Sequence, residues 1–343
     1  MIKVEYLIFF ISLAVTYLGV GWFRRWSLRK GYLDHPNERS SHDTPTPRGG
    51  GLVIAAVTLT AYIGCAWLVN YKLSVGFIVG SILIVVVSWL DDIYSLSFLW
   101  RLLVHLTAAA AVIADVGYFD AIAIPFVETP LRLGILNMVI SLVLIAWFVN
   151  AYNFMDGIDG LAGVQAVAAG LGWLLIGLFM GVPTATVIGG VVVCTSIGFL
   201  IHNWEPAKIF MGDAGSAFLG FTFASIPFLV REQGIVRPEL LPVVAVLFVW
   251  LFVFDSAVTV VRRLFRGERV WTAHREHFYQ KMVIAGHSHQ FVSSLYGSIA
   301  VAIAIPAALM VDMHHSSTSY LLALIVVLSV VVMLATTYRS RSV

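Results

Sequence analysis

Three acidic motifs in this 343-residue chain contain the residue types that could bind a divalent cation. Asp91 and Asp92 are adjacent, Asp156 and Asp159 are three positions apart, and Asp213 lies among small residues in "FMGDAGSAFLG". Carboxylate oxygens without cysteine are the hard ligands that Mg²⁺ or Mn²⁺ prefers, and no HExxH motif suggests zinc. The motifs therefore predict a site for Mg²⁺, with Mn²⁺ as a substitute.

The spacing of these acids limits which of them can act together. Neighbouring residues of a helix point about 100° apart, so Asp91 and Asp92 would face different groups. Asp156 and Asp159 are spaced to meet on one helical turn, with Asn153 one turn earlier. Each motif also has an ordinary structural interpretation: acids at a helix end, a polar turn, and for the third motif a helix N-cap.

Basic and histidine side chains accompany the acidic motifs. The segment "AHREHFYQ" contains His274, Arg275 and His277, which can donate several hydrogen bonds to phosphate oxygens. Arg48 lies in "TPTPRGGG", where prolines stiffen the chain and glycines permit close approach of the backbone, and Arg101 follows the Asp pair. Anion-binding groups around acidic metal ligands indicate phosphate chemistry.

The composition indicates that a membrane positions these motifs. The chain is 59% hydrophobic and 12% charged, with a mean hydropathy of +0.91, far from the composition of a soluble domain. A hydrocarbon core about 30 Å thick requires roughly 20 helical residues, and lipid offers no partners to an unpaired backbone. We predict an all-α polytopic integral membrane protein, with residues 1–343 forming a single catalytic domain.

Hydropathy predicts about eleven transmembrane helices. These are residues 4–23, 51–69, 73–90, 102–118, 134–150, 163–182, 184–201, 215–230, 239–260, 291–311 and 319–337. The segments between them that fall on one side, together with the C-terminal tail, are 24–50, 91–101, 151–162, 202–214 and 261–290. They hold 16 of the 21 Lys and Arg residues, which by the positive-inside rule places this side in the cytoplasm and the N-terminus outside. Every motif above falls on this side, so we expect one active site on the cytoplasmic face.

Five motifs also occur in the order of a known family. They are "PNERSSHDTPTPRGGG", "WLDDIYSLS", "NFMDGIDGLAG", "FMGDAGSAFLG" and "AHREHFYQ". The sequence resembles the polyprenyl-phosphate N-acetylhexosamine-1-phosphate transferases of glycosyltransferase family 4. This superfamily includes the bacterial undecaprenyl-phosphate GlcNAc-1-phosphate transferase and the muramoyl-pentapeptide transferase.

The resemblance implies a reaction and its partners. N-acetylhexosamine-1-phosphate would pass from a UDP-N-acetylhexosamine to undecaprenyl phosphate in the bacterial inner membrane, releasing UMP and starting O-antigen or other cell-envelope glycan synthesis. The last motif is not the triple-His version and looks more like the O-antigen branch, some of whose members use FucNAc or QuiNAc. The sugar and the oligomeric state stay open, and no nucleic acid is expected as a partner.

The resemblance also implies roles for the acidic residues. By motif position, Asp159 and Asp213 would hold Mg²⁺. Asp91 and Asp92 match the family's acidic pair, for which a role in activating the lipid phosphate has been argued, and we group Asp156 with them as catalytic. Direct attack by the lipid phosphate and a covalent aspartyl intermediate both stay open.

The remaining expectations concern substrate contacts and departures from the family pattern. The predicted substrate-binding residues are Arg48, Arg101, Asn153, His274, Arg275 and His277. Phe98 stands where Pro is usual and His105 where Gln is usual, which affects the entry of the following helix and any side-chain contact there.

Two rival classes share some of these features. A secondary transporter would also have about eleven helices, but its sites lie near the midplane, whereas only Asp255 and His105 fall clearly within predicted spans here. An intramembrane aspartyl protease needs two close acids sharing a proton and gives no reason for the basic segments. The transporter is retained as the alternative function.

Overall fold

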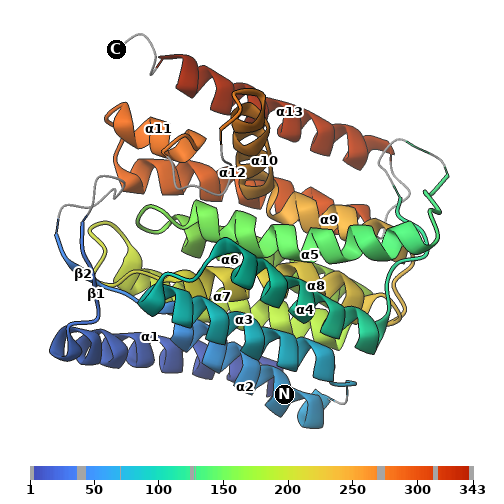
Figure 1. Cartoon of the computed structure of the whole chain (residues 1–343). Helices are drawn as coiled ribbons and strands as arrows, with labels where there is room; N and C mark the ends of the chain where they lie inside the picture. The colour runs from blue at the N-terminus through green and yellow to red at the C-terminus, as the bar shows by residue number, and fades with distance from the viewer. Residues whose placement is uncertain are drawn as a thin grey trace.

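Long apolar helices that run roughly side by side make up almost all of the structure (Figure 1). This computed structural model describes residues 4–36, 44–69, 71–123, 127, 129–268, 275–311 and 316–339. The first eight helices are α1 (Val4–Lys30), α2 (Gly51–Val69), α3 (Val75–Tyr94), α4 (Phe98–Val116), α5 (Ile135–Met155), α6 (Leu161–Met180), α7 (Pro183–Asn203) and α8 (Asp213–Val230). The others are α9 (Leu241–Phe248), α10 (Trp250–Phe265), α11 (Phe278–Ile284), α12 (His289–Met310) and α13 (Ser316–Arg339). A 3-10 turn, Pro238–Leu240, precedes α9, and two short antiparallel strands, β1 (Leu33–Asp34) and β2 (Thr46–Pro47), precede α2.

The helices have the length and composition of membrane spans. Within the described residues, nine helices can cross a membrane, or ten if α9 and α10 count as one broken span. The last predicted span lies in α13, where the stretch Leu322–Val332 is apolar but shorter. The prediction of a helical, multi-pass membrane protein is confirmed, while the total of eleven spans and their orientation stay predictions.

The predicted span 239–260 is not one straight helix. Pro238–Phe248 and Trp250–Phe265 are bent relative to each other by 74°, because Val249, with φ −118° and ψ 26°, leaves the helical conformation. The Trp250 indole N–H then donates to Ser329 Oγ of α13 at 3.2 Å. Hydropathy reports only the length of an apolar run, and Val249 is as apolar as its neighbours, so the sequence pattern did not reveal the bend.

Helix α8 lies at the centre of the bundle. Its residues from Ala214 to Val230 are all buried, and it packs against α2, α3, α4, α5, α6, α7 and α9. The outer helices carry large exposed apolar side chains such as Phe10 and Trp67, which suits contact with lipid. Small residues allow the close contacts: a Cβ added to Gly51 of α2 would lie 2.3 Å from Gly215 Cα of α8.

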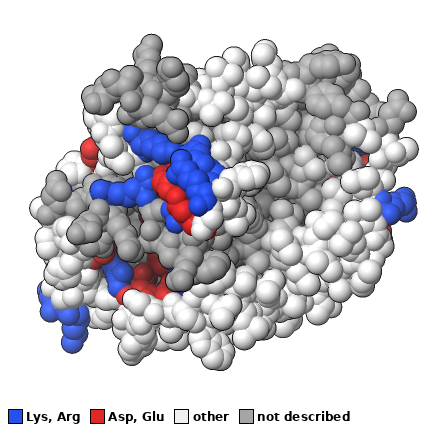
Figure 2. Space-filling view, turned by 45° about the horizontal axis from the view of Figure 1, so that its top comes forward, with Lys and Arg blue, Asp and Glu red and all other residues white. Residues whose placement is uncertain are grey.

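The connections that carry the sequence motifs meet at one end of the bundle, at the left of Figure 1. We call this the polar end and define it as residues 31–36, 44–50, 95–97, 156–160, 204–212 and 275–288. Backbone hydrogen bonds join its parts, such as Gly50 N–H to Phe210 O at 3.0 Å and Phe210 N–H to Pro47 O at 2.8 Å. In Figure 2 most visible charged side chains of the described residues gather toward the same side, and a broad uncharged face separates them from a few at the right.

The contact between Gly51 and Gly215 should be essential for stability. We expect Gly51→Ala to lower the unfolding temperature in detergent, because the added methyl would meet the Gly215 backbone, which cannot rotate away, and overpacking costs about 1–3 kcal/mol. Gly64 lies on the same helix with nothing within 4 Å of an added Cβ, so Gly64→Ala should unfold at or above the wild-type temperature. Equal effects of the two variants, measured by thermal unfolding, would contradict this account.

Candidate active site

Asp91, in the last turn of α3, forms hydrogen bonds that hold the connection between α3 and α4. Its Oδ1 accepts the Leu96 backbone N–H at 2.7 Å, and its Oδ2 accepts from Arg101 Nη1 at 2.6 Å. These bonds close the turn that begins at Ser95, which has φ 52°, and hold Arg101 in the first turn of α4. Both carboxylate oxygens of Asp91 are therefore engaged by the protein.

Asp92 points in a different direction, as the angle between helical neighbours requires. Its side chain is 4% exposed, and its Oδ1 lies 3.4 Å from Arg48 Nη1. Its Oδ2 is buried and makes no hydrogen bond of normal geometry, although the Asp213 backbone N–H lies near this carboxylate, and an added Cβ on Gly212 would be 3.2 Å from this oxygen. Burying a carboxylate oxygen without such a hydrogen bond is costly, so this atom suggests a site for a cation.

Arg48 is held between Asp92 and an aromatic ring. Its guanidinium carbon lies 5.2 Å from the centre of the Tyr32 ring, a cation–π distance. Burial, together with the nearby Asp92 carboxylate, raises the pKa of Tyr32 to about 12. The Tyr32 hydroxyl therefore stays protonated at neutral pH beside the charged pair.

Asp213 begins α8 and is not its N-cap. The N-cap is Gly212, whose φ of 78° favours glycine, so the structural role considered for Asp213 from sequence is not the one found. An acid in the first helical turn interacts favourably with the helix dipole. Asn153, in the last turn of α5, donates to Ser216 Oγ at 3.1 Å and lies against the Asp213 side chain, which aligns the ends of α5 and α8.

Asp156 and Asp159 do not share a helical turn, contrary to the expectation from their spacing. Helix α5 ends at Met155, and both acids lie in the connection before α6. Asp159 Oδ2 accepts the Ala207 N–H at 2.9 Å, and its Oδ1 lies 3.5 Å from His289 Nδ1. Among the described residues, no donor hydrogen-bonds the Asp156 carboxylate.

We call Asp92, Asp156 and Asp213 the acidic cluster. Burial and the carboxylates of Asp213, Asp92 and Asp159 raise the pKa of Asp156 well above its usual value. In the part of the chain that the structure describes, no three His, Cys, Asp or Glu side chains are placed to hold a metal by themselves. Mg²⁺ usually keeps several waters and takes substrate phosphates as ligands, so an incomplete protein donor set fits this ion.

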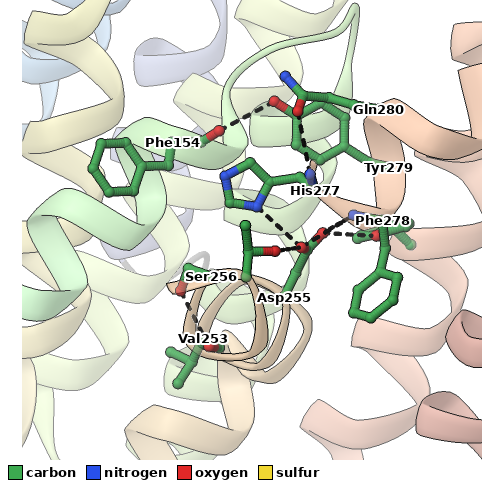
Figure 3. A network of polar contacts seen from close by, with 10 residues as sticks. Phe154, Val253, Asp255, Ser256, His277, Phe278, Tyr279 and Gln280 are labelled. Atoms are coloured by element: carbon green, nitrogen blue, oxygen red, sulfur yellow. Dashed lines mark hydrogen bonds and ion pairs between the residues drawn. The ribbon is translucent and has the colours of Figure 1, made fainter. Parts of the chain in front are cut away.

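The last sequence motif is attached to the connection that carries Asp156. The Tyr279 hydroxyl donates to Phe154 O at 3.1 Å, and a Cβ on Gly157 would lie 2.1 Å from that hydroxyl. His277, just before α11, is buried and stacks on Tyr279 with ring centres 5.8 Å apart. Figure 3 shows these residues approaching the end of α5 from the side of α11. Arg275 is half-buried two residues earlier.

Some predicted residues lie elsewhere or outside the described part. His274 falls in the segment 269–274, which the structure does not describe. His105 is buried between α4 and α5 with its Nδ1 3.2 Å from Asn150 Nδ2, and Phe98 forms the start of α4. His289, which lies beside Asp159, was not among the site residues predicted from the sequence, because it lies outside the five motifs.

The comparisons with known proteins identify the family of this chain. Residues 74–230 match the family model described as glycosyl transferase family 4, a range that includes every residue of the acidic cluster. Over 350 residues the chain is 30% identical to a decaprenyl-phosphate N-acetylglucosaminephosphotransferase of Mycolicibacterium smegmatis, covering 93% of this chain and 85% of that protein. The chain belongs to glycosyl transferase family 4.

Two further members of the family are similar over most of their length. A probable undecaprenyl-phosphate N-acetylglucosaminyl 1-phosphate transferase of Bacillus subtilis is 27% identical over 282 residues, covering 82% of this chain and 78% of that one. An undecaprenyl-phosphate alpha-N-acetylglucosaminyl 1-phosphate transferase of Yersinia pestis is 29% identical over 290 residues, with 81% and 76% covered. The resemblance drawn from the five motifs is thus confirmed at the level of the family.

The crowding around Asp156 predicts a pH-dependent stability in the absence of divalent cations. A carboxyl whose pKa is higher in the folded state contributes stability at low pH and loses it as the pH rises through the folded pKa. In EDTA, Asp156→Asn should therefore unfold at a higher temperature than wild type at about pH 8, and the difference should shrink toward about pH 5.

Thermal unfolding in detergent at both pH values would check this expectation. Adding Mg²⁺ should stabilise wild type more than Asp156→Asn, because the variant has lost one of the crowded charges. Asp120→Asn serves as the control, since Asp120 is exposed at the other end of the bundle. A variant at Asp156 that is less stable than wild type at both pH values would contradict the argument.

Proposed function

We propose that this chain transfers N-acetylhexosamine-1-phosphate from a UDP-N-acetylhexosamine to undecaprenyl phosphate, releasing UMP, on the cytoplasmic face of the bacterial inner membrane. The observation that carries the proposal is the acidic cluster beside Arg48 and Arg101, at the ends of membrane helices in a chain of this family. The three relatives described above are named as transferases of N-acetylglucosamine phosphate to undecaprenyl or decaprenyl phosphate. The sugar is proposed to be GlcNAc or a 6-deoxy relative such as FucNAc or QuiNAc.

The position of the cluster suits one substrate in the membrane and one in water. Asp92 lies in the last turn of α3 and Asp213 in the first turn of α8, so both are at the ends of spans. A lipid phosphate at the membrane surface can reach such a site from the side, and a nucleotide sugar can reach it from solution. The excess of Lys and Arg in the same segments supports the cytoplasmic assignment.

Two anionic substrates must be brought together at this site. At an effective dielectric of 20, two unit charges 5 Å apart repel by roughly 3 kcal/mol, and several such pairs would meet. Arg48 and Arg101 are placed at the site by Asp92 and Asp91. The protein thus supplies fixed cations where phosphates would bind.

A divalent cation would neutralise more of this charge and stabilise the leaving UMP. We propose Asp213 and Asp159 as its ligands, as the resemblance implies. Asp159 Oδ1 lies 3.5 Å from His289 Nδ1, which is longer than a normal hydrogen bond. This oxygen could therefore bind a cation without breaking a strong contact. Asp156 interacts electrostatically with both residues and is a third carboxylate available to the ion.

The proposed reaction is a direct displacement. An oxygen of the lipid phosphate attacks the phosphorus that bears the sugar, and the bond from that phosphorus to the bridging oxygen breaks, so that UMP leaves with this oxygen. Asp92 is a better candidate than Asp91 to accept a proton from the lipid phosphate, because Asp92 Oδ2 makes no hydrogen bond of normal geometry whereas both oxygens of Asp91 are engaged. A phosphomonoester has a second pKa of about 6, so this base assistance contributes modestly near neutral pH.

The transporter alternative finds less support. Transporter sites lie near the midplane in broken helices, whereas the acidic cluster lies at helix ends. The broken span found in the described part of the chain, α9 with α10, places its buried acid, Asp255, against α11 and α12. Solute flux in liposomes without any chemical product would favour transport over the transferase.

The two adjacent aspartates should respond differently to substitution. Asp92→Asn should reduce UMP release by at least about 100-fold, because it removes the unpaired carboxylate and the partner of Arg48. Asp91→Asn should instead lower the unfolding temperature as well as the rate, since Asp91 closes the turn before α4. Asp120→Asn should leave both unchanged, and an active Asp92→Asn enzyme would contradict the assignment.

The reaction itself is tested by incubating the purified protein with Mg²⁺, undecaprenyl phosphate and a panel of UDP-sugars. We expect UMP and a lipid diphosphosugar to appear together, only with the lipid present, and only for UDP-N-acetylhexosamines. UMP release that does not need the lipid would argue against direct displacement, as would a phosphorylated aspartate trapped in a single turnover. No product with any sugar would contradict the proposed function.

A further inference from the structure

Asp255 of α10 is a fully buried carboxylate that the proposed reaction does not use. Its Oδ1 lies 3.0 Å from His277 Nδ1, and its Oδ2 accepts the Phe278 N–H at 2.9 Å. Tyr296 of α12 and Thr259 of α10 donate hydroxyls to it at 3.4 Å and 3.3 Å. A buried charge is costly unless it is paired and hydrogen-bonded, and here donors from α10, α11 and α12 and from His277 converge on one carboxylate (Figure 3).

The contact with Asp255 determines which ring nitrogen of His277 carries the proton and which way the ring is oriented. A carboxylate can only accept a hydrogen bond, so the proton of the contact must be on His277 Nδ1. In Figure 3 the second ring nitrogen, Nε2, is turned away from Asp255 toward the side of Phe154. Phe154 lies two residues before Asp156, and its ring centre is 6.5 Å from that of His277. Nε2 therefore faces the end of α5 that leads into the acidic cluster.

The bend at Val249 is what places Asp255 in this position. It carries α10 across the direction of the other helices, beside α11 and α12 (Figure 1). Gln280 Oε1 accepts the His277 backbone N–H at 3.3 Å. The His277 ring is thus held by the Asp255 carboxylate and by the stacked Tyr279 ring.

We propose that Asp255 is a positioning residue of the transferase site. It fixes the tautomer and orientation of His277, so that Nε2 contacts the nucleotide sugar. The inference rests on the proposed function for the identity of that ligand. Such partners of a functional histidine commonly affect activity by about 10–100-fold when they are replaced.

The alternative is that Asp255 only holds α10, α11 and α12 together. Asp255→Asn is nearly isosteric and keeps an oxygen that can accept the Phe278 N–H, but its amide can donate to His277 Nδ1 and so favour the other tautomer. Tyr296→Phe is the matched control, because it removes a different hydrogen bond to the same carboxylate, and from a side chain that is equally buried. A purely structural role would affect stability in both variants and leave substrate kinetics similar.

The kinetic test compares these variants by UMP release and thermal unfolding in detergent. We expect Asp255→Asn to raise the KM for the UDP-sugar, and lower kcat/KM for it, by at least about 10-fold, with the KM for undecaprenyl phosphate unchanged. Tyr296→Phe should stay within about twofold of wild type. In a His277→Gln background, Asp255→Asn should cause no further loss, because the two residues act as a unit. The proposal would be overturned if Asp255→Asn lowered kcat/KM for the UDP-sugar as much in the His277→Gln background as it does in the wild-type protein.

A measurement independent of turnover separates this inference from the proposed function. With ¹⁵N-labelled histidine, the ring signals of His277, assigned by their loss in His277→Gln, should show the proton on Nδ1 in wild type and a redistribution toward Nε2 in Asp255→Asn. An unchanged pattern would overturn the positioning role. If this shift occurs while no UDP-sugar yields UMP, the positioning of His277 stands and the proposed function fails.

If Asp255→Asn does not fold, two substitutions at His277 replace it. The Asn amide nitrogen falls near the position of Nδ1 and the Gln amide nitrogen near that of Nε2. When Nε2 is the atom that contacts substrate, His277→Gln should keep more kcat/KM for the UDP-sugar than His277→Asn. The reverse order would overturn the proposal.

Discussion

Mutual repulsion between carboxylates at one end of a helical bundle is the constraint on which the rest of this structure depends. Asp92, Asp156 and Asp213 come from the ends of three different helices, and burial together with the neighbouring carboxylates makes Asp156 harder to ionise. Such a cluster persists only if the helices are held in fixed register by other contacts. The Gly51–Gly215 approach and the Asn153–Ser216 hydrogen bond provide this register between α8 and its neighbours.

Arg48 and Arg101, beside the acidic cluster, balance this repulsion only in part, because among the described residues each forms an ion pair with a single carboxylate. Arg101 is bound to Asp91, outside the cluster, and Arg48 reaches one oxygen of Asp92 and leaves the other without a hydrogen bond of normal geometry. The described residues therefore place more acidic groups in the cluster than they balance with cations. In a family whose members handle phosphorylated substrates, that excess is consistent with a site completed by a cation and by the substrates themselves.

The sequence predicted those features that depend on local periodicity and composition. The divergence of Asp91 and Asp92 follows from helix geometry, and the spans follow from the length of the apolar runs. The features that depend on contacts between distant segments were not predictable: the bend at Val249, the Ala207 and His289 contacts of Asp159, and the partner of His277. Asp255 was visible as an acid inside an apolar run, but which histidine it faces depends on how α10 crosses the bundle.

The bend and the last motif are parts of one arrangement. A straight helix through α9 and α10 would form all of its backbone hydrogen bonds. A 74° break in an apolar span therefore needs other interactions that offset the backbone hydrogen bonds it loses. The interactions available are the hydrogen bonds around Asp255, which join α10 to α11 and α12. Through Tyr279 the same segment is joined to Phe154 and Gly157, beside Asp156. The geometry of the acidic cluster and the placement of His277 are therefore coupled through a short chain of buried contacts. A substitution in the acidic cluster should alter the position of His277, and a substitution at His277 should alter the geometry of the cluster.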